Sequence, residues 1–409
     1  MSNWKRTFGI IWAGEFFSSL TSSIVGFAII FWISIETKSA EVLAFGMVAT
    51  LLPQLVLGLF TGVYIDRWNR KVIMIAADLF MAACTAVLVV IFYLGKIEIW
   101  HIYALSAMRS AGNAFYSPAM KASVPMLAPA DQLMRISGIN QVIYSGSNIA
   151  GPALAAFLIT VVKMENILIL EIIGAIIACV SLLFVTIPNP RKAENAKPAF
   201  IQEIKIGLQA IFNRKGMKWL FISDLTAMFF ILPISALFPL MTINHFLGNT
   251  YQMSLIEIVW SGGMLFGGFL IGTNILKKYN KAILIGLMCV VDGLTFLFTG
   301  VLPPSGFIWF AVFSAMSGVA AAIWNSAFTV VMQTAIETDK LGRAFSTYDS
   351  LSLLPSIPGL LATGFIAESI GLTNSFIIAG SAIFAVGIFV MLMPSMQELG
   401  KTVESQTAN

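Results

Sequence analysis

The sequence predicts an all-α integral membrane protein in which twelve spanning helices form two similar six-helix halves. Three observations lead to this prediction: the composition, the regular recurrence of long apolar runs, and an internal repeat. Of the 409 residues, 58% are hydrophobic and 11% are charged, whereas a soluble domain carries about 25% charged residues. This composition cannot supply a water-soluble surface, so the chain belongs to the membrane class.

The apolar runs are long enough to cross a bilayer, which takes about 20 mostly apolar residues. They cover residues 8–35, 42–64, 72–95, 99–120, 136–162, 166–187, 217–244, 252–276, 282–302, 307–332, 345–368 and 374–394. Most connections are short, so neighbouring helices must run antiparallel. The polar stretch 188–216 is the exception. We therefore predict an N-terminal bundle (1–187), a cytoplasmic linker (188–216), a C-terminal bundle (217–394) and a cytoplasmic tail (395–409).

The basic residues predict the orientation. If the N-terminus is cytoplasmic, 20 of the 24 Lys and Arg fall on cytoplasmic segments, Lys38, Lys96 and Lys163 fall outside, and Arg109 lies within a span. Cytoplasmic loops carry an excess of Lys and Arg. Both termini are therefore expected in the cytoplasm.

Several features recur after about half the chain. Glu15 is followed by Asp224 at an offset of 209, and Gly151 by Gly359 at 208. The G-x-x-x-G pair that begins at Gly58 recurs at an offset of 210, each copy preceding a basic turn. The agreement of these offsets indicates a duplication with both halves in the same orientation. Parallel halves of this kind hold a binding site between them near the bilayer midplane, with access alternating by rocking.

The stretch 58–71, GLFTGVYIDRWNRK, concentrates charges at the end of the second span. The glycines allow a neighbouring helix to approach closely. Asp66 can pair with an arginine or meet the N-terminus of another helix, and a contact that breaks when the halves move would act as a gate. Alternatively, the basic residues are only positive-inside anchors, although Asp66 adds nothing to anchoring.

This stretch resembles the cytoplasmic signature of the major facilitator superfamily, roughly G-x-x-x-D-R-x-G-R-K. The matching positions are Gly62, Asp66, Arg67, Arg70 and Lys71. Asn69 stands where the family usually has glycine, and asparagine tolerates a left-handed turn nearly as well. The resemblance implies that these residues form a cytoplasmic gate that stabilises the outward-open state.

Two further stretches resemble motifs of the same superfamily. Arg109-Ser-Ala-Gly-Asn resembles an arginine motif linked to proton coupling. An arginine inside a span costs roughly 2.5–3.5 kcal/mol, so it should have a partner; a fixed salt bridge without a transport role is the alternative. The fifth span resembles the antiporter motif of exporters through Gly146, Ser147, Gly151 and Pro152. Ser147 replaces a glycine but is still small enough for close helix packing.

Over nearly its whole length the sequence is similar to the macrolide-efflux permeases of bacteria. The resemblance implies proton-driven export of macrolide-type antibiotics by a carrier in the inner membrane that uses no cofactor other than protons. The expected partners are a hydrophobic or cationic drug and the lipid bilayer. The chain is expected to be a monomer and not to bind nucleic acid.

A proton-coupled carrier needs a carboxyl group that is readily protonated near neutral pH in a low-dielectric setting. Glu15 is the first candidate because Ser18 and Ser22 follow it on one small, polar helix face. Asp224 is its repeat partner. For Asp292, a structural role fits at least as well as a role in proton coupling. Four other acids lie closer to span ends, where snorkelling or local pairing accounts for them: Asp78, Glu171, Glu257 and Asp349.

The expected substrate cavity draws on several spans. Its candidate lining residues are Ser18, Ser22, Asn113, Tyr116, Asn140, Tyr144, Met228, Trp260, Met264, Trp324 and Asn325. Aromatic and thioether side chains suit a bulky amphipathic cation. The alternatives are an exporter of other amphipathic drugs and a nutrient symporter, against which the Gly151-Pro152 pair argues. A scramblase or membrane enzyme is a further alternative, but the sequence shows no cluster of His, Cys or carboxylates near one interface, so we predict no enzyme.

Overall fold

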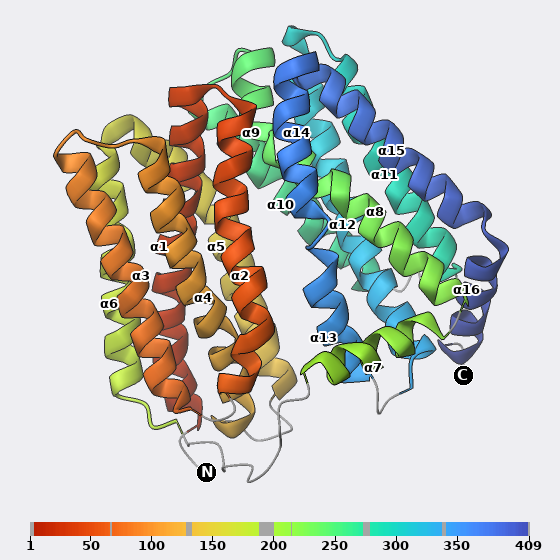
Figure 1. The fold of residues 1–409 in the computed structure, drawn as a ribbon, viewed down its shortest axis with the longest axis horizontal. Helices are drawn as coiled ribbons and strands as arrows, with labels where there is room; N and C mark the ends of the chain where they lie inside the picture. Colours follow the sequence, from red (N-terminus) through yellow and green to blue (C-terminus); the bar gives the residue numbers. More distant parts are fainter. Residues whose placement is uncertain are drawn as a thin grey trace. The chain divides into compact units, whose positions relative to one another are not determined.

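The computed structural model describes residues 4–65, 68–127, 133–187, 200–213, 215–272, 279–337 and 341–407. Within these ranges the regular elements are helices, without a strand (Figure 1). Ten helices of the described ranges have the length and apolar composition to cross a membrane. The chain divides into two compact units: unit 1 comprises Met1–Thr37 and Phe45–Pro198, and unit 2 comprises Lys38–Ala44 and Ala199–Asn409.

Unit 1 is a bundle of long helices. They are α1 (Trp4–Thr37), α2 (Ala40–Ile65, whose first turns cluster with unit 2), α3 (Arg70–Tyr93), α4 (Ile99–Leu127), α5 (Leu133–Val161) and α6 (Met164–Leu183). Helix α1 packs against α5 and α6, and α3 packs against α4 and α6. Glycines permit the close approach to α1, since a Cβ at Gly174 would collide with Thr21 and one at Gly151 with Ser23.

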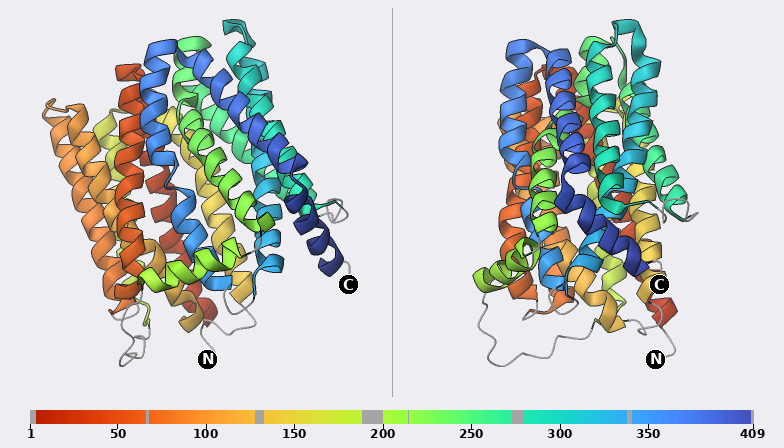
Figure 2. Two further views of the ribbon diagram at one scale, coloured as in Figure 1. Left: turned by 45° about the vertical axis from the view of Figure 1, so that its right-hand side comes forward. Right: turned by 90° about the vertical axis from the view of Figure 1, so that its right-hand side faces the viewer.

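Unit 2 is also helical, with more interruptions. It holds α7 (Phe200–Phe212), α8 (Lys215–Ala236), α9 (Phe238–Leu240), the π-helical η2 (Met241–His245), α10 (Thr250–Gly272), α11 (Lys281–Val301), the 3₁₀ turn η4 (Pro304–Gly306), α12 (Phe307–Ala335), α13 (Leu341–Ser352), α14 (Ser356–Ile370), α15 (Leu372–Leu392) and α16 (Pro394–Thr407). Helix α11 lies alongside α15, and α10 alongside α12 (Figures 1 and 2).

A glycine seam joins α11 to α15. Gly286 and Gly293 of α11 face Gly387 and Gly380 of α15 so closely that an added Cβ would meet backbone: one at Gly286 would lie 2.9 Å from the Gly387 oxygen, and one at Gly293 would lie 2.8 Å from the Gly380 oxygen. Gly300 continues the row, 2.6 Å from the Thr373 oxygen by the same measure. The two backbones therefore touch, and no larger residue fits at these positions.

The predicted eleventh span, 345–368, is not one continuous helix. It consists of α13 and α14, separated by Leu353, Leu354 and Pro355. Pro355 explains the break, because proline disfavours helical geometry at the residue before it. The predicted seventh span, 217–244, likewise begins as α8 and ends in α9 and η2.

Two predicted spans fall outside the ten helices that qualify by length and apolar composition. Helix α4 is long enough but less apolar, since it contains Arg109 and Lys121, and α14 is a shorter apolar helix. With these two included, the helices are consistent with twelve crossings.

The predicted linker and tail both contain helices that pack on unit 2. Helix α7 runs across the end of the bundle against α13 and α8 (Figures 1 and 2), and its Ile211 is fully buried. Helix α16 packs on α8, α11 and α12 and buries Met396 and Leu399.

The three cysteines are free and buried. Cys84 lies in α3, Cys179 in α6 and Cys289 in α11.

Candidate functional site

Glu15 accepts a hydrogen bond from a tyrosine inside unit 1. The hydroxyl of Tyr116, on α4, lies 2.6 Å from Glu15 Oε2, on α1. Tyr116 is itself buried. It therefore faces the candidate coupling residue rather than offering an open wall to a substrate.

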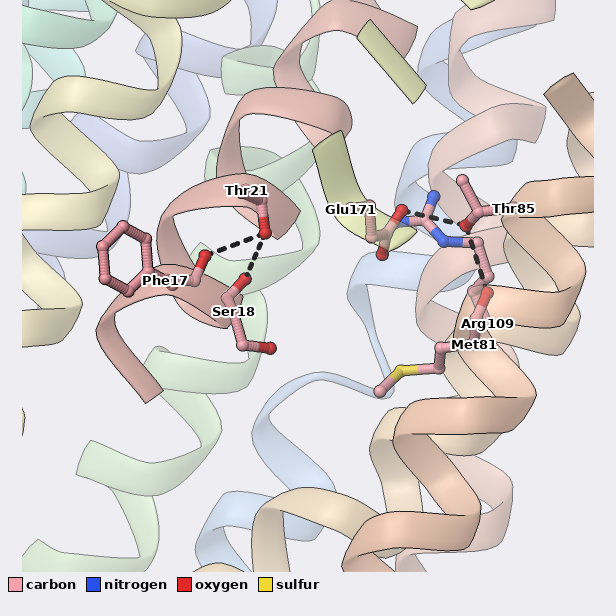
Figure 3. A network of polar contacts seen from close by, with 7 residues as sticks. All are labelled: Phe17, Ser18, Thr21, Met81, Thr85, Arg109 and Glu171. Carbon is pink, nitrogen blue, oxygen red and sulfur yellow. Dashed lines mark hydrogen bonds and ion pairs between the residues drawn. The ribbon is translucent and has the colours of Figure 1, made fainter. Parts of the chain in front are cut away.

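Arg109 has the partner that its position in a span demands (Figure 3). Its Nη2 lies 2.5 Å from Glu171 Oε1 on α6, and both side chains are largely buried. The other carboxylate oxygen accepts a 2.9 Å hydrogen bond from the Thr85 hydroxyl of α3. This ion pair therefore connects three helices of unit 1.

Asp78 is a third acid in the interior of unit 1, beside the partly buried Glu15 and the buried Glu171. It lies on α3 with 1% of its surface exposed, and its Oδ2 accepts no hydrogen bond. It interacts electrostatically with Glu15 and with Glu171. The prediction that Asp78 and Glu171 snorkel at span ends or pair locally is wrong, because both are buried and their interactions come from other helices. Helices α3 and α6 each begin two residues before the predicted span, at Arg70 and Met164, so both acids lie two residues farther from the start of the helix.

Helix α1 presents small polar residues near Glu15. The Thr21 hydroxyl donates to the Phe17 carbonyl at 2.8 Å and to the Ser18 carbonyl at 3.1 Å (Figure 3). Ser22 is partly buried on the same helix. The indole of Trp12 donates to Asn140 Oδ1 of α5 at 2.9 Å. The predicted cavity residue Asn140 is thus engaged by α1.

Part of the predicted gate can be placed. Gly62 lies in α2, while Asp66 and Arg67 lie outside the described residues, so the expected contact of Asp66 stays a prediction. Arg70 is buried. Lys71 Nζ donates to the carbonyls of Leu183 at 3.1 Å and Val185 at 2.9 Å, at the end of α6. A lysine at a helix C-terminus stabilises the terminal carbonyls.

Asn69 does not form the expected left-handed turn. Its φ is −67° and its ψ 109°, and its side chain caps α3 by accepting from the Val72 amide. Asparagine is among the best N-cap residues. Asn280 caps α11 in the same way in unit 2. Asn69, which stands where the family usually has glycine, thus acts as the N-cap of α3.

The antiporter motif lies along α5, and its two glycines differ in how closely other helices approach them. A Cβ at Gly146 would meet nothing within 4 Å, whereas Gly151 touches Ser23 of α1. Ser147 and Pro152 are buried, and Ser147 Oγ accepts or donates no hydrogen bond. Gly359, the repeat partner of Gly151, touches Phe229 of α8. Gly151 therefore allows α1 to pack closely in unit 1, and Gly359 allows α8 to pack closely in unit 2.

In unit 2, Asp224 borders a crevice too narrow for a water molecule. The walls come from α8, α11, α12 and α15 and include Ser223, Cys289 and Trp324. The Tyr348 hydroxyl lies near Asp224, but neither Asp224 oxygen accepts a hydrogen bond of good geometry. The surroundings of Asp224 are thus mainly apolar.

The remaining cavity candidates differ in environment. Tyr144 is 62% exposed, and Asn113 is partly buried on α4. Asn325 is exposed beside Trp324, which stacks on Phe328 with ring centroids 5.5 Å apart. The Met228 carbonyl accepts a 3.1 Å hydrogen bond from Ser356. Trp260 and Met264 lie on α10, where their backbone packs against Gly318 of α12.

The other acids have structural partners or no described partner. Asp292 accepts a hydrogen bond from the Ser317 hydroxyl of α12, which fits the structural role weighed for it. Glu257 lies on α10, and Asp349 lies on α13 with its side chain outside the described residues.

Sequence reasoning missed the Glu171 partner of Arg109 and the burial of Asp78. One signal was present: an arginine within a span requires an acid, and the acids of spans 3 and 6 were the candidates left without a function. Their span-end positions hid them.

The family model for the Major Facilitator Superfamily matches residues 11–359. The chain belongs to the major facilitator superfamily. Macrolide efflux protein A of Streptococcus pyogenes is 34% identical over 400 residues, which cover 97% of this chain and 98% of that protein. Macrolide efflux protein A of Enterococcus faecalis is 36% identical over 324 residues, 79% of this chain and 99% of the relative. Multidrug efflux pump Tap of Mycobacterium bovis is 24% identical over 361 residues, 86% of this chain and 84% of the pump.

Solved structures show the same fold at low identity. The crystal structure of the nucleoside transporter NupG aligns with a TM-score of 0.73 at 12% identity, covering 96% of this chain and 98% of that chain. The superfamily and the named relatives are transporters, and the chain is a multi-pass membrane transporter of this superfamily.

Proposed function

We propose that this carrier exports macrolide-type antibiotics across the bacterial inner membrane in exchange for protons, by alternating access. The observation that carries the proposal is the 34% identity to a macrolide efflux protein over 97% of the chain. Both proteins share nearly their whole length, so the likeness includes every span rather than the superfamily motifs alone.

The interior of unit 1 supports proton coupling. The Tyr116 hydroxyl donates a hydrogen bond to Glu15 at 2.6 Å. This hydrogen bond can rearrange when the Glu15 carboxyl gains or loses a proton. Asp224 is the corresponding acid of unit 2 and is surrounded mainly by apolar walls. Carboxyl groups in such settings exchange protons near neutral pH, as a coupled carrier requires.

The gate and the orientation are part of the proposal. The 20-to-3 distribution of Lys and Arg supports cytoplasmic termini, which places Lys71 and the end of α6 on the cytoplasmic side. We propose that Asp66, Arg67, Arg70 and Lys71 stabilise the outward-open state from there. The carrier acts as a monomer with protons as its coupling ion.

The test is erythromycin accumulation in energised cells, with and without a protonophore. Export should stop when the protonophore collapses the proton gradient. The Glu15→Gln/Asp224→Asn double variant should reach the membrane in normal amounts but lose uphill export. Undiminished export by this variant would exclude both acids as coupling groups, and export that ignores the protonophore would exclude proton coupling.

A broader substrate range is the second candidate, supported by the 24% identity to a multidrug efflux pump over 86% of the chain. Inhibition zones for macrolides of several ring sizes and for unrelated amphipathic cations would separate the two. Protection restricted to macrolides favours the first proposal, and protection against the cations as well favours the second.

A further inference from the structure

The interior of unit 1 holds more acid than base. Glu15, Asp78 and Glu171 come from α1, α3 and α6, and Asp78 interacts electrostatically with both of the others. The cation that the structure places beside them is Arg109. No group of His, Cys, Asp and Glu among the described residues could hold a metal ion, so a metal does not account for this grouping.

Arg109 is already engaged. Its guanidinium lies 2.5 Å from Glu171 Oε1, and Thr85 donates to Oε2 of the same carboxylate. Charge-assisted hydrogen bonds are stronger than those between neutral groups. The Arg109 guanidinium is therefore bound by Glu171.

Asp78 has no comparable support. It is 1% exposed, and its Oδ2 accepts no hydrogen bond. The titratable groups that face it are Glu15 from α1, Tyr116 from α4, and Glu171 and Cys179 from α6. None of these is a cation. A buried charge without a counter-ion takes up a proton instead, so Asp78 is neutral in this arrangement.

We propose that Asp78 is a proton-binding residue of the transport cycle, acting beside Glu15, while Arg109 and Glu171 stay paired with each other. This inference rests on the proton-coupled export proposed above. In the release step the O–H bond of the Asp78 carboxyl breaks, the carboxylate keeps the electron pair, and water accepts the proton. Uptake from water on the other side of the membrane reverses the step.

The competing explanation is a permanently neutral structural acid. Asparagine imitates a neutral aspartic acid in size and polarity. If Asp78 never loses its proton, Asp78→Asn should therefore transport normally. If Asp78 binds and releases a proton in each cycle, the same variant is locked in the protonated form and uncoupled.

The experiment uses the purified full-length carrier in proteoliposomes, with erythromycin as the probe. Under an imposed pH gradient, Asp78→Asn should accumulate at least 10-fold less erythromycin than the wild type, while erythromycin exchange without a gradient stays within threefold. Asp78→Glu should recover part of the accumulation. Asp292→Asn is the matched control, a buried aspartate held by Ser317, and should accumulate like the wild type.

The outcomes separate the two proposals. A wild type that cannot accumulate erythromycin under a pH gradient overturns proton-coupled export itself. A coupled wild type together with an equally coupled Asp78→Asn overturns only the role of Asp78.

A second measurement does not depend on transport. Infrared difference spectra between acidic and alkaline pH record the protonated carboxyl band of the folded protein. The band should shrink in Asp78→Asn relative to both the wild type and Asp292→Asn. An unchanged band overturns the inference even if Asp78→Asn is inactive for other reasons.

Discussion

Two pairs of helices hold equivalent places in the repeat but make different contacts. They are α3 and α6, the third and sixth spans, in unit 1, and α11 and α15, the ninth and twelfth spans, in unit 2. Helices α3 and α6 meet through Thr85 and Glu171, with Arg109 added from α4. Helices α11 and α15 meet through glycines whose backbones touch. Gly380 follows Glu171 by 209 residues, the offset of the repeat. Where one half has the carboxyl group that contacts Arg109, the other has a glycine without a side chain.

A duplicated fold can thus conserve the arrangement of its helices while its two halves differ in the chemistry of equivalent helix contacts. The glycine seam leaves no space for a titratable side chain in unit 2 between α11 and α15. The polar seam of unit 1, formed by Thr85, Arg109 and Glu171, admits buried polar groups because Glu171 finds partners on two neighbouring helices. The described ion pair between Arg109 and Glu171 therefore has no counterpart where the glycines of α11 and α15 meet.

The largest expected effect tests the polar seam. Arg109→Gln leaves Glu171 buried without its cation, and breaking such a pair destabilises a protein by about 3–5 kcal/mol. We expect a large fall in the melting temperature of the purified carrier. The double variant Arg109→Gln/Glu171→Gln should recover most of it, because neither charge then remains. A double variant as unstable as the single one would contradict the pairing.

The next effect tests the glycine seam. Gly293→Ala places a Cβ against the backbone of α15, and overpacking of this kind costs about 1–3 kcal/mol. The melting temperature should fall and the folded yield should drop on gel filtration. Gly268→Ala on α10 is the control, since nothing lies within 4 Å of its added Cβ. Equal stability of the two variants would show that the seam is not tightly packed.

The smallest effect compares the two asparagine caps. Asn69→Ala removes an N-cap, which is worth about 0.5–2 kcal/mol. Asn280→Ala also removes the 2.9 Å hydrogen bond from its Nδ2 to the Gln397 carbonyl of α16, worth about 1 kcal/mol more. Asn280→Ala should therefore lower the melting temperature further than Asn69→Ala. The reverse order would mean that α16 does not depend on this contact.

The sequence predicted the fold class and the helices because hydrophobic length dominates in a bilayer. It placed both ends of most helices within a few residues. It missed the division of the eleventh span because Leu353 and Leu354 are as apolar as any helical residue, and only the following Pro355 signals the break. It did not predict the docking of α16, whose contacts with unit 2 depend on helices distant in the sequence.

The candidate site was predicted in part. The need of Arg109 for a partner followed from its cost in a span, but the identity of Glu171 depends on how α4 and α6 pack, which spacing along one helix cannot show. Asn69 was recognised as a substitution for glycine, yet its role as a cap depends on its backbone angles. The repeat related Glu15 to Asp224 but gave no sign that Glu15 accepts a 2.6 Å hydrogen bond from the Tyr116 hydroxyl of α4.

The concealment of all three native thiols has a practical consequence. Because Cys84, Cys179 and Cys289 are buried, maleimide reagents should label the folded wild-type carrier only weakly. Fluorescent or spin probes attached to newly introduced surface cysteines will then dominate the signal, without a cysteine-free background having to be made first. Distances between such probes, followed while erythromycin is added, would reveal directly how this transporter changes shape.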